Sequence, residues 1–294
     1  MSRRAPGDAT RAKHLIVTAD DFGLSREVNE AVELAHSDGI LSAASLMVAG
    51  DAAADAVARA HRLPRLGVGL HLVLVDGRPV LPPEQLPALV DADGRFPRDP
   101  LRAGVRLFCR RGARAQAAAE IRAQLAAFHA TGLALDHLNT HHHFHLHPTV
   151  QALLLDLACE QRLPPLRLPV EPPGGAWRSD PAETLRRWLA WSFHGLRTRA
   201  LRRRLRAAGV ACNDACFGIW DSGRMDRARL AAAIAALPDG VSEIYCHPAT
   251  RRSADQPASY QPVAELAALR DPTIRDLLAR LGVRPVRFAD LGAT

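Results

Sequence analysis

Short apolar segments that alternate with amphipathic ones restrict the fold of this 294-residue chain more than any other feature. The segments 14–18, 41–50 and 66–74 consist mostly of β-branched, leucine and small residues. Between them apolar residues recur at helical spacing, and Ser25 stands where a helix N-cap is expected. Strands that alternate with helices predict an α/β chain with a parallel sheet, covered on both faces and closed or nearly closed into a barrel.

The same criteria predict the remaining elements. Further strands are expected in residues 133–140, 165–169, 215–219 and 242–248, and helices in 26–39, 51–62, 116–131, 149–162, 182–208 and 226–237. Residues 76–100 are rich in proline, glycine and aspartate, so we expect a long loop there that forms a wall of a substrate cleft.

The composition, with 48% hydrophobic and 23% charged residues, is that of a globular protein. A single domain over residues 1–294 fits best, because α/β barrels commonly reach this size undivided. Within it we expect a flexible N-terminus at 1–12 and loop or helical insertions at 76–100 and 170–210.

Several classes of protein are disfavoured. The chain has no apolar run of about 18 residues, so a membrane-spanning helix is not expected. No apolar stretch with a cleavage site follows the charged first residues, which favours a cytoplasmic protein over a secreted one. The five cysteines are scattered and odd in number, which predicts reduced thiols. The net charge of +7 is accompanied by no recognised nucleic-acid-binding motif, so we expect no nucleic-acid partner.

An acidic pair, Asp20 and Asp21, follows the first apolar segment. Two adjacent carboxylates at a strand end allow a division of roles, in which one binds a metal ion and the other acts on a water molecule. A solvated turn with a helix-capping aspartate is the alternative interpretation of the pair alone.

A histidine cluster covers residues 141–147, which contain five of the 13 histidines. If the strand before it continued, alternate residues would share a face, so we expect His141, His143 and His145 to point together and His142 away. Imidazole nitrogens suit zinc and similar divalent ions, and extra histidines can orient a ligand by hydrogen bonding. The position of the cluster after a strand favours an active site over an accidental metal-sequestering tract.

Two further histidines, His71 and His247, end other predicted strands. Each taken alone would more often be an ordinary core or surface residue. Chemistry in barrels gathers at the carboxyl ends of the strands, and these ends together supply Asp, His and His. That is the set expected for a catalytic metal ion with open coordination positions.

These motifs, taken together, resemble those of the YdjC-like carbohydrate deacetylases. The matching segments are TADDFGLS (18–25), GVGLHLVL (67–74), HLNTHHHFHLHP (137–148), LRLP (166–169) and YCHP (245–248). The resemblance implies a (β/α) barrel-like fold, an irregular TIM-type barrel with about seven strands. It also implies hydrolytic removal of the acetyl group from an acetylamino sugar.

The resemblance also implies roles for individual residues. Asp20, the first aspartate of ADDFG, would be the general base, and His247 would be the general acid. The metal ligands would be Asp21, His71 and His141. Arg167, within LRLP, would orient Asp20 or contact the substrate, with a surface arginine as the alternative.

One position departs from the pattern of the family's chitooligosaccharide deacetylases, which tend to have aspartate where this chain has Asn139. The asparagine form resembles the hopanoid-biosynthesis-associated (HpnK) branch, whose implied substrate is an N-acetylglucosaminyl hopanoid. Asn139, His143 and His145 are therefore expected to bind substrate or to support the metal ligands.

The sequence is compatible with several alternatives. Aspartate with two histidines accepts zinc or magnesium, and also manganese or iron. The aromatic and arginine-rich stretch 186–206 suits peripheral contact with an anionic membrane, or else packs on the barrel and faces water. The rival functions are a deacetylase of soluble chitooligosaccharides and a non-catalytic metal- or lipid-binding protein. The sequence gives no indication of the oligomeric state.

Overall fold

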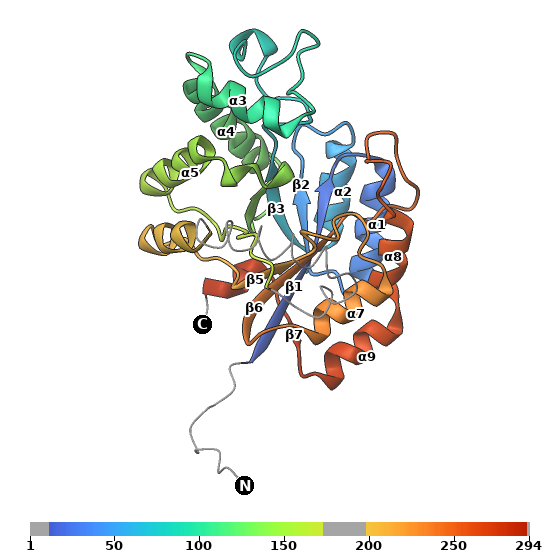
Figure 1. The fold of residues 1–294 in the computed structure, drawn as a ribbon. Coiled ribbons are helices and arrows are strands. Elements are labelled where there is room, and N and C mark those ends of the chain that lie inside the picture. Colours follow the sequence, from blue (N-terminus) through green and yellow to red (C-terminus); the bar gives the residue numbers. More distant parts are fainter. Residues whose placement is uncertain (1–11, 173–197, 293–294) are drawn as a thin grey trace, which may run out of the picture.

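The computed structural model of the protein describes residues 12–172 and 198–292. In this part of the chain the strands form one seven-stranded sheet in the order β4-β3-β2-β1-β6-β5, with β7 paired to β1 (Figure 1). All registered pairs are parallel. The strands are β1 (Lys13–Phe22), β2 (Ala43–Leu46), β3 (Gly67–Leu72), β4 (Leu138–Thr140), β5 (Ala215–Phe217), β6 (Gly240–Cys246) and β7 (Arg284–Pro285).

The two edges of the sheet approach each other through residues 165–170. On one side Leu138 donates its backbone N–H to the Pro165 carbonyl oxygen at 2.9 Å, and Leu138 and Leu166 form an isolated parallel bridge. On the other side Cys216 of β5 donates its N–H to the Val170 carbonyl oxygen at 2.7 Å. The segment therefore links β4 to β5, and the predicted α/β barrel-like fold with irregular closure is confirmed.

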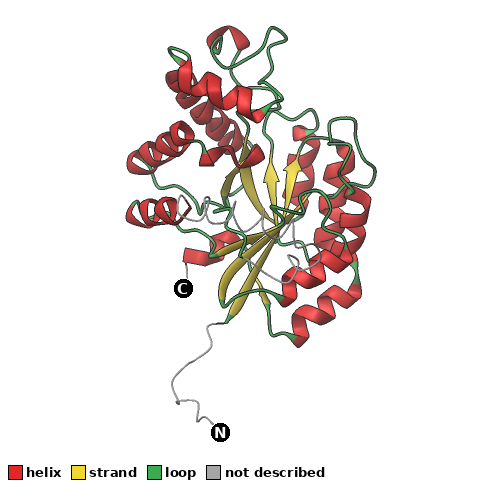
Figure 2. Cartoon of the chain, viewed as in Figure 1, coloured by secondary structure: helices red, strands yellow, loops and turns green. Residues whose placement is uncertain are grey.

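Helices surround this sheet, as Figure 2 shows. They are α1 (Arg26–Ser37), α2 (Ala53–Arg62), α3 (Pro100–Cys109), α4 (Ala113–Ala130), α5 (Pro148–Glu160), α7 (Arg227–Ala235), α8 (Pro262–Arg270) and α9 (Pro272–Arg280). Residues 198–207 are also helical. Ser25 caps α1 as predicted, because its hydroxyl oxygen accepts the N–H of Val28. The sequence analysis did not predict α3, α8 or α9.

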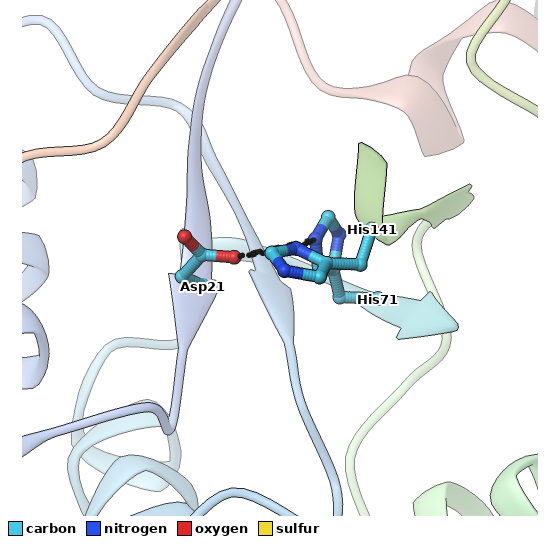
Figure 3. A group of neighbouring side chains, drawn as sticks. All are labelled: Asp21, His71 and His141. Atoms are coloured by element: carbon cyan, nitrogen blue, oxygen red, sulfur yellow. Dashed lines mark hydrogen bonds and ion pairs between the residues drawn. The ribbon is translucent and has the colours of Figure 1, made fainter. Parts of the chain in front are cut away.

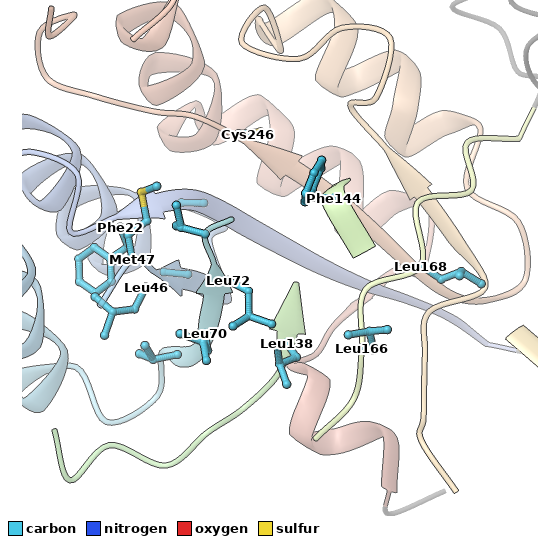
Figure 4. Packing of buried hydrophobic residues seen from close by; sticks show 14 of the residues in the cluster. Phe22, Leu46, Met47, Leu70, Leu72, Leu138, Phe144, Leu166, Leu168 and Cys246 are labelled. Atoms are coloured by element: carbon cyan, nitrogen blue, oxygen red, sulfur yellow. The ribbon is translucent and has the colours of Figure 1, made fainter. Parts of the chain in front are cut away.

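Side chains at alternate positions of β1 point to opposite faces of the sheet and pack in two different apolar clusters. Leu15, Val17 and Ala19 belong to the main apolar cluster, which also contains the buried faces of the helices. Figure 4 shows part of this cluster, including Leu70 and Leu138 from the neighbouring strands β3 and β4. Ile16, on the other face of β1, packs instead with Ala43 and Phe288 in a small second cluster.

The face of the strands that carries this second cluster is polar nearer their carboxyl ends. Thr18 and Asp20 follow Ile16 at alternate positions of β1 and are buried. Gly69 of β3 is required there, since a Cβ atom would lie only 2.4 Å from the His137 ring. The barrel interior thus changes from apolar to hydrogen-bonded toward the end where the site lies.

Some predictions fall on the undescribed residues. The flexible N-terminus at 1–12 lies almost entirely outside the described range, as do 173–197 of the insertion 170–210 and 186–197 of the membrane-contact stretch 186–206. In the described ranges, no helix has both the length and the hydropathy needed to cross a bilayer. The five cysteines are free thiols, as predicted.

Candidate active site

A cleft of about 260 Å³ lies at the carboxyl ends of the strands. Asp21, His141 and Tyr260 are among the residues that line it. Part of its wall comes from the long loop after β3, as predicted for residues 76–100, through Asp76, Gly77, Arg78, Arg95 and Arg98. The cleft gives a small molecule access to the predicted metal ligands.

Three of the predicted site residues lie close together, and two of them, Asp21 and His141, line the cleft (Figure 3). His71 Nε2 lies 3.4 Å from Asp21 Oδ1, and His141 Nδ1 lies 3.2 Å from the same oxygen. The two imidazole nitrogens are 3.2 Å apart. Three strand ends that are distant in sequence therefore bring three potential ligand atoms into a nearly equilateral triangle.

A backbone irregularity explains how the adjacent residues Asp20 and Asp21 both serve this site. In a regular strand their side chains would point to opposite faces. The β1–β2 register shifts between Ala19 and Phe22, and Asp21 has a φ of 63°, which is uncommon for a residue other than glycine. The bulge turns Asp21 toward His71 while Asp20 remains on the inner face of the strand.

The histidine cluster does not continue β4, and the prediction of an extended segment was wrong. Residues His141–Leu146 form a 3-10 helix, with His142 and His143 at φ values of 53° and 51°. His141, His143 and His145 consequently do not share a face. His141 contributes to the ligand triangle, whereas the buried His145 Nδ1 lies 2.7 Å from the Thr140 hydroxyl and His143 Nε2 lies 3.0 Å from the Tyr245 hydroxyl.

The proton positions in the triangle favour a cation. His71 Nδ1 lies 2.6 Å from Asn139 Oδ1, an acceptor, so this nitrogen carries a proton and Nε2 is the nitrogen that would bind an ion. The buried Asp21 Oδ1 has no hydrogen-bond donor among the described residues. Burial raises the pKa of Asp21, but His141 and His71 outweigh burial and hold this pKa well below its usual value. An anionic oxygen thus converges with two imidazole nitrogens, and a divalent cation would satisfy all three atoms.

The spacing of the triangle also fits one ion. Two ligand atoms at roughly 2.1 Å from a divalent ion lie about 3.0 Å apart at a right angle and about 3.4 Å apart at the tetrahedral angle. The measured separations of 3.2–3.4 Å fall in this interval. A second cluster, Asp76 with His141 and His142, also brings ligand atoms close together, but it is more exposed. The buried triangle is therefore the better site.

Asn139 connects the ligand triangle to the polar interior of the barrel. Its Nδ2 donates to Asp20 Oδ1 at 3.1 Å and to Ser45 Oγ at 2.8 Å. Ser45 Oγ lies 3.0 Å from His137 Nε2, and His137 Nδ1 lies 2.9 Å from Asp136 Oδ2. Asn139 thus fixes the orientation and tautomer of His71, as expected of a residue that supports a metal ligand.

Replacing Asn139 with leucine should weaken divalent-ion binding by about 10- to 100-fold, because His71 loses the acceptor that orients it. Asn139→Asp keeps an acceptor for His71 and should retain more of the affinity. Metal titration against a chromophoric chelator measures both variants. Equal affinity in Asn139→Leu and the parent protein would show that Asn139 does not position His71.

Arg167 binds Asp20 in the fully buried interior and is not the surface arginine of the alternative interpretation. Its Nη1 and Nη2 donate to the two oxygens of Asp20 at 2.5 and 2.9 Å, and its Nε and Nη2 donate to Glu243. Burial alone would raise the pKa of Asp20, but the Arg167 guanidinium outweighs it and holds this pKa well below its usual value. Arg167 therefore positions Asp20 and keeps it ionised.

Arg167→Met should lower the free energy of unfolding by about 3–5 kcal/mol, since it leaves two buried carboxylates without a counter-charge. The effect should grow with pH. In the parent protein the depressed pKa of Asp20 adds stability, and this stability is lost only in acid. In the variant burial raises the pKa of Asp20, so ionisation of Asp20 destabilises the variant as pH rises. Urea unfolding at pH 5 and pH 8 tests this. The matched control Arg122→Met removes the exposed pair with Glu160 and should cost at most about 1 kcal/mol at either pH.

His247 follows β6 and lies buried beside the tyrosine rings of Tyr245 and Tyr260. Burial lowers its pKa, and the charges of Asp21 and Asp20 only partly oppose this. Its backbone N–H donates to Glu265, whose own pKa burial raises to about 7. The imidazole is therefore mostly neutral at pH 7 and close enough to the two aspartates to interact with their charges.

Sequence reasoning missed four buried residues of this site. Glu243 pairs with Arg167 and also accepts a hydrogen bond from Thr18. Tyr245 contacts His143 and the Arg167 guanidinium. Glu265 accepts the backbone N–H of His247, and Ser45 accepts a hydrogen bond from Asn139. One signal was present in the sequence. Glu243, Tyr245 and His247 occupy alternate positions of the predicted strand 242–248, and an acid within an apolar strand requires a buried partner.

Comparison with known proteins shows which family the sequence of this chain matches. A family model described as YdjC-like protein matches residues 14–280. A carbohydrate deacetylase of Geobacillus stearothermophilus is 33% identical over 285 residues, which cover 95% of this chain and 98% of that protein. A carbohydrate deacetylase of Brevibacillus brevis is 44% identical over 152 residues, but the match spans only 57% of its length and 51% of this chain.

The fold has a counterpart among solved structures. A crystal structure from Enterococcus faecalis V583, described as that of a cellobiose-phosphate cleavage protein, superposes with a TM-score of 0.72 and 22% identity. The alignment covers 95% of this chain and 99% of the other. At that identity the likeness supports the fold alone. The family match over nearly the whole chain, together with the full-length relative, shows that this protein belongs to the family of YdjC-like proteins.

Proposed function

We propose that this protein is a metal-dependent hydrolase that removes the N-acetyl group from an acetylamino sugar. The observation that carries the proposal is the triangle of Asp21, His71 and His141, with the Arg167-bound Asp20 next to it in the chain. The two curated relatives described above, both carbohydrate deacetylases, support the reaction class. Asp21 Oδ1, His71 Nε2 and His141 Nδ1 would hold the ion.

The chemistry requires an activated water molecule and a stabilised developing oxyanion. A bound divalent ion supplies both, because it polarises an amide carbonyl group and lowers the pKa of a coordinated water from 15.7 to about 7. We assign to Asp20 the role of accepting the water proton. Because Arg167 lowers its pKa, Asp20 is a weak base that remains fully ionised, and it depends on this acidification of water.

The leaving amine requires a proton, and we assign its delivery to His247. A lowered pKa means that few molecules carry the imidazolium at pH 7, but the protonated form is a stronger acid. His247 Nδ1 is buried without a hydrogen-bond partner in the described part of the chain, so its neighbours do not fix a single protonation state. Tyr245 and Tyr260 limit the movement of the ring.

For the substrate we propose the N-acetylglucosaminyl head group of a hopanoid or a similar lipid. The cleft volume of about 260 Å³ is slightly below the range of small-molecule sites, about 300–1,000 Å³, and suits one sugar unit rather than a long oligosaccharide. Asn139 in place of the carboxylate of the chitooligosaccharide enzymes agrees with this choice. Zinc and magnesium are the preferred ions for the site.

Acetate release from an N-acetylglucosaminyl lipid and from diacetylchitobiose, each measured with and without chelator, tests the proposal. We expect metal-dependent release, faster with the lipid-linked sugar. Faster release from diacetylchitobiose would overturn the choice of substrate but not the reaction. Metal binding without acetate release from either compound would support a non-catalytic binding protein and contradict the proposed function.

A further inference from the structure

Helix α3 has an apolar face that is exposed to solvent. Leu101, Val105 and Phe108 are 75%, 53% and 73% exposed, and their spacing of four and three residues places them in one stripe along the helix. Ala103 and Leu107, on the opposite side, are buried, and α3 packs there against α4. Among the described residues, three of the five large hydrophobic side chains that are exposed lie on this one helix.

Arginines border this apolar face. Residues 95–114 contain seven arginines and one aspartate. Three acids outside this segment, Asp76, Asp91 and Asp156, pair with four of the arginines, so the positive charge of the surface exceeds the negative charge by about three. Arg110 and Arg111 are exposed at the end of α3, and the side chain of Arg102 is 57% exposed although it pairs with Asp91. An exposed apolar stripe with a basic rim is the composition of helices that lie in the interface of an anionic membrane.

The helix also lies near the mouth of the candidate active site. Arg95 and Arg98 line the cleft, and α3 begins two residues later at Pro100. In Figure 1, α3 lies beyond the end of the barrel toward which β2 and β3 point. A flat surface that contacted Leu101, Val105 and Phe108 would therefore lie close to the cleft entrance.

We propose that α3 docks the protein onto an anionic lipid bilayer, with Leu101, Val105 and Phe108 inserted among the lipids and Arg110 and Arg111 at the head groups. A second copy of the chain is a poorer occupant. Pairing two α3 faces would place the unpaired arginines of two positive segments together, whereas anionic head groups neutralise that charge. The choice of a lipid-linked substrate rests on the proposed function, but the docking surface does not.

Sedimentation with phosphatidylcholine vesicles, with and without phosphatidylglycerol, tests the docking. The parent protein should bind the anionic vesicles more tightly, and added salt should weaken binding. Changing Leu101, Val105 and Phe108 together to serine should weaken binding by at least about 10-fold, because apolar burial is lost. The matched control, Val263→Ser with Leu281→Ser, removes exposed apolar side chains elsewhere and should bind like the parent protein.

A second variant tests the charged rim. Arg110→Gln with Arg111→Gln should weaken binding to anionic vesicles on the order of 10-fold and leave binding to neutral vesicles unchanged. Failure of the parent protein to bind, or equal binding by the triple-serine variant, would overturn the proposal. So would a dimer of the parent protein that the triple-serine variant converts to monomer without a change in vesicle binding.

These outcomes separate docking from catalysis. The triple-serine variant should release acetate from a soluble acetylamino sugar at the parent rate, because none of the three side chains lines the cleft. Its release of acetate from a lipid-linked sugar in anionic vesicles should fall in parallel with binding. If the parent protein binds vesicles but releases no acetate from either compound, the docking surface stands and the proposed function fails.

Discussion

Asp20→Asn is expected to lower the rate of acetate release by about 10²- to 10⁴-fold while the protein retains its metal ion. The amide keeps the shape of the side chain and an acceptor for Arg167, but it cannot take a proton from water. Asp20 is not among the three atoms of the ligand triangle, so the ion should remain. Steady-state kinetics and metal analysis of the same preparation measure the two properties.

Two comparisons make the Asp20 result specific. Asp21→Asn alters the neighbouring carboxylate and should lower metal content as well as turnover, because Asp21 Oδ1 is a vertex of the triangle. Thermal unfolding of Asp20→Asn shows whether the loss of the ion pair with Arg167 disturbs the fold. Full activity in a folded Asp20→Asn protein would rule out Asp20 as the general base.

If the proposed function is right, His141→Ala should abolish both metal retention and turnover, with a loss of activity greater than about 10³-fold, because a catalytic ion contributes several kcal/mol to such a reaction. The adjacent His142→Ala is the matched control. His142 belongs only to the outer cluster with Asp76, so this variant should keep its ion. If His142→Ala lost the ion and His141→Ala kept it, the assignment of the ligands would be wrong.

The sequence predicted the architecture and the convergence of the ligands for a simple physical reason. Parallel strands carry their carboxyl ends to the same edge of a sheet, so polar residues that end separate strands must come together. Asp21 and His71 meet on this basis, and His141 joins them although it follows β4 rather than continuing it. The positions at strand ends were sufficient to predict this convergence, whereas the choice of Asp21 and His141 as ligands came from the family resemblance.

Local spacing could not predict backbone conformations that the surroundings impose. The positive φ angles of Asp21, His142 and His143 break the alternation on which strand predictions rely. For Asp21 the change directs a side chain into the site. In the histidine cluster it turns an expected strand into a 3-10 helix and divides the histidines between the triangle, Thr140 and Tyr245.

Long-range charge pairing was also hidden. Arg167 and Glu243 are separated by 76 residues, and each stands within an apolar segment. The sequence around each residue does not identify its partner, although the cost of burying an unpaired charge implies that a partner of opposite charge exists. Helix α3 was not predicted for a different reason. Residues 100–109 combine an exposed apolar stripe with arginines and so lack the polar outer face of an ordinary surface helix.

The most direct test of the central claim is anomalous diffraction from crystals of the protein soaked with zinc or manganese. The account predicts one strong peak within about 2.0–2.3 Å of Asp21 Oδ1, His71 Nε2 and His141 Nδ1. A peak at Asp76 and His142 with no density in the triangle, in crystals of active protein, would contradict it.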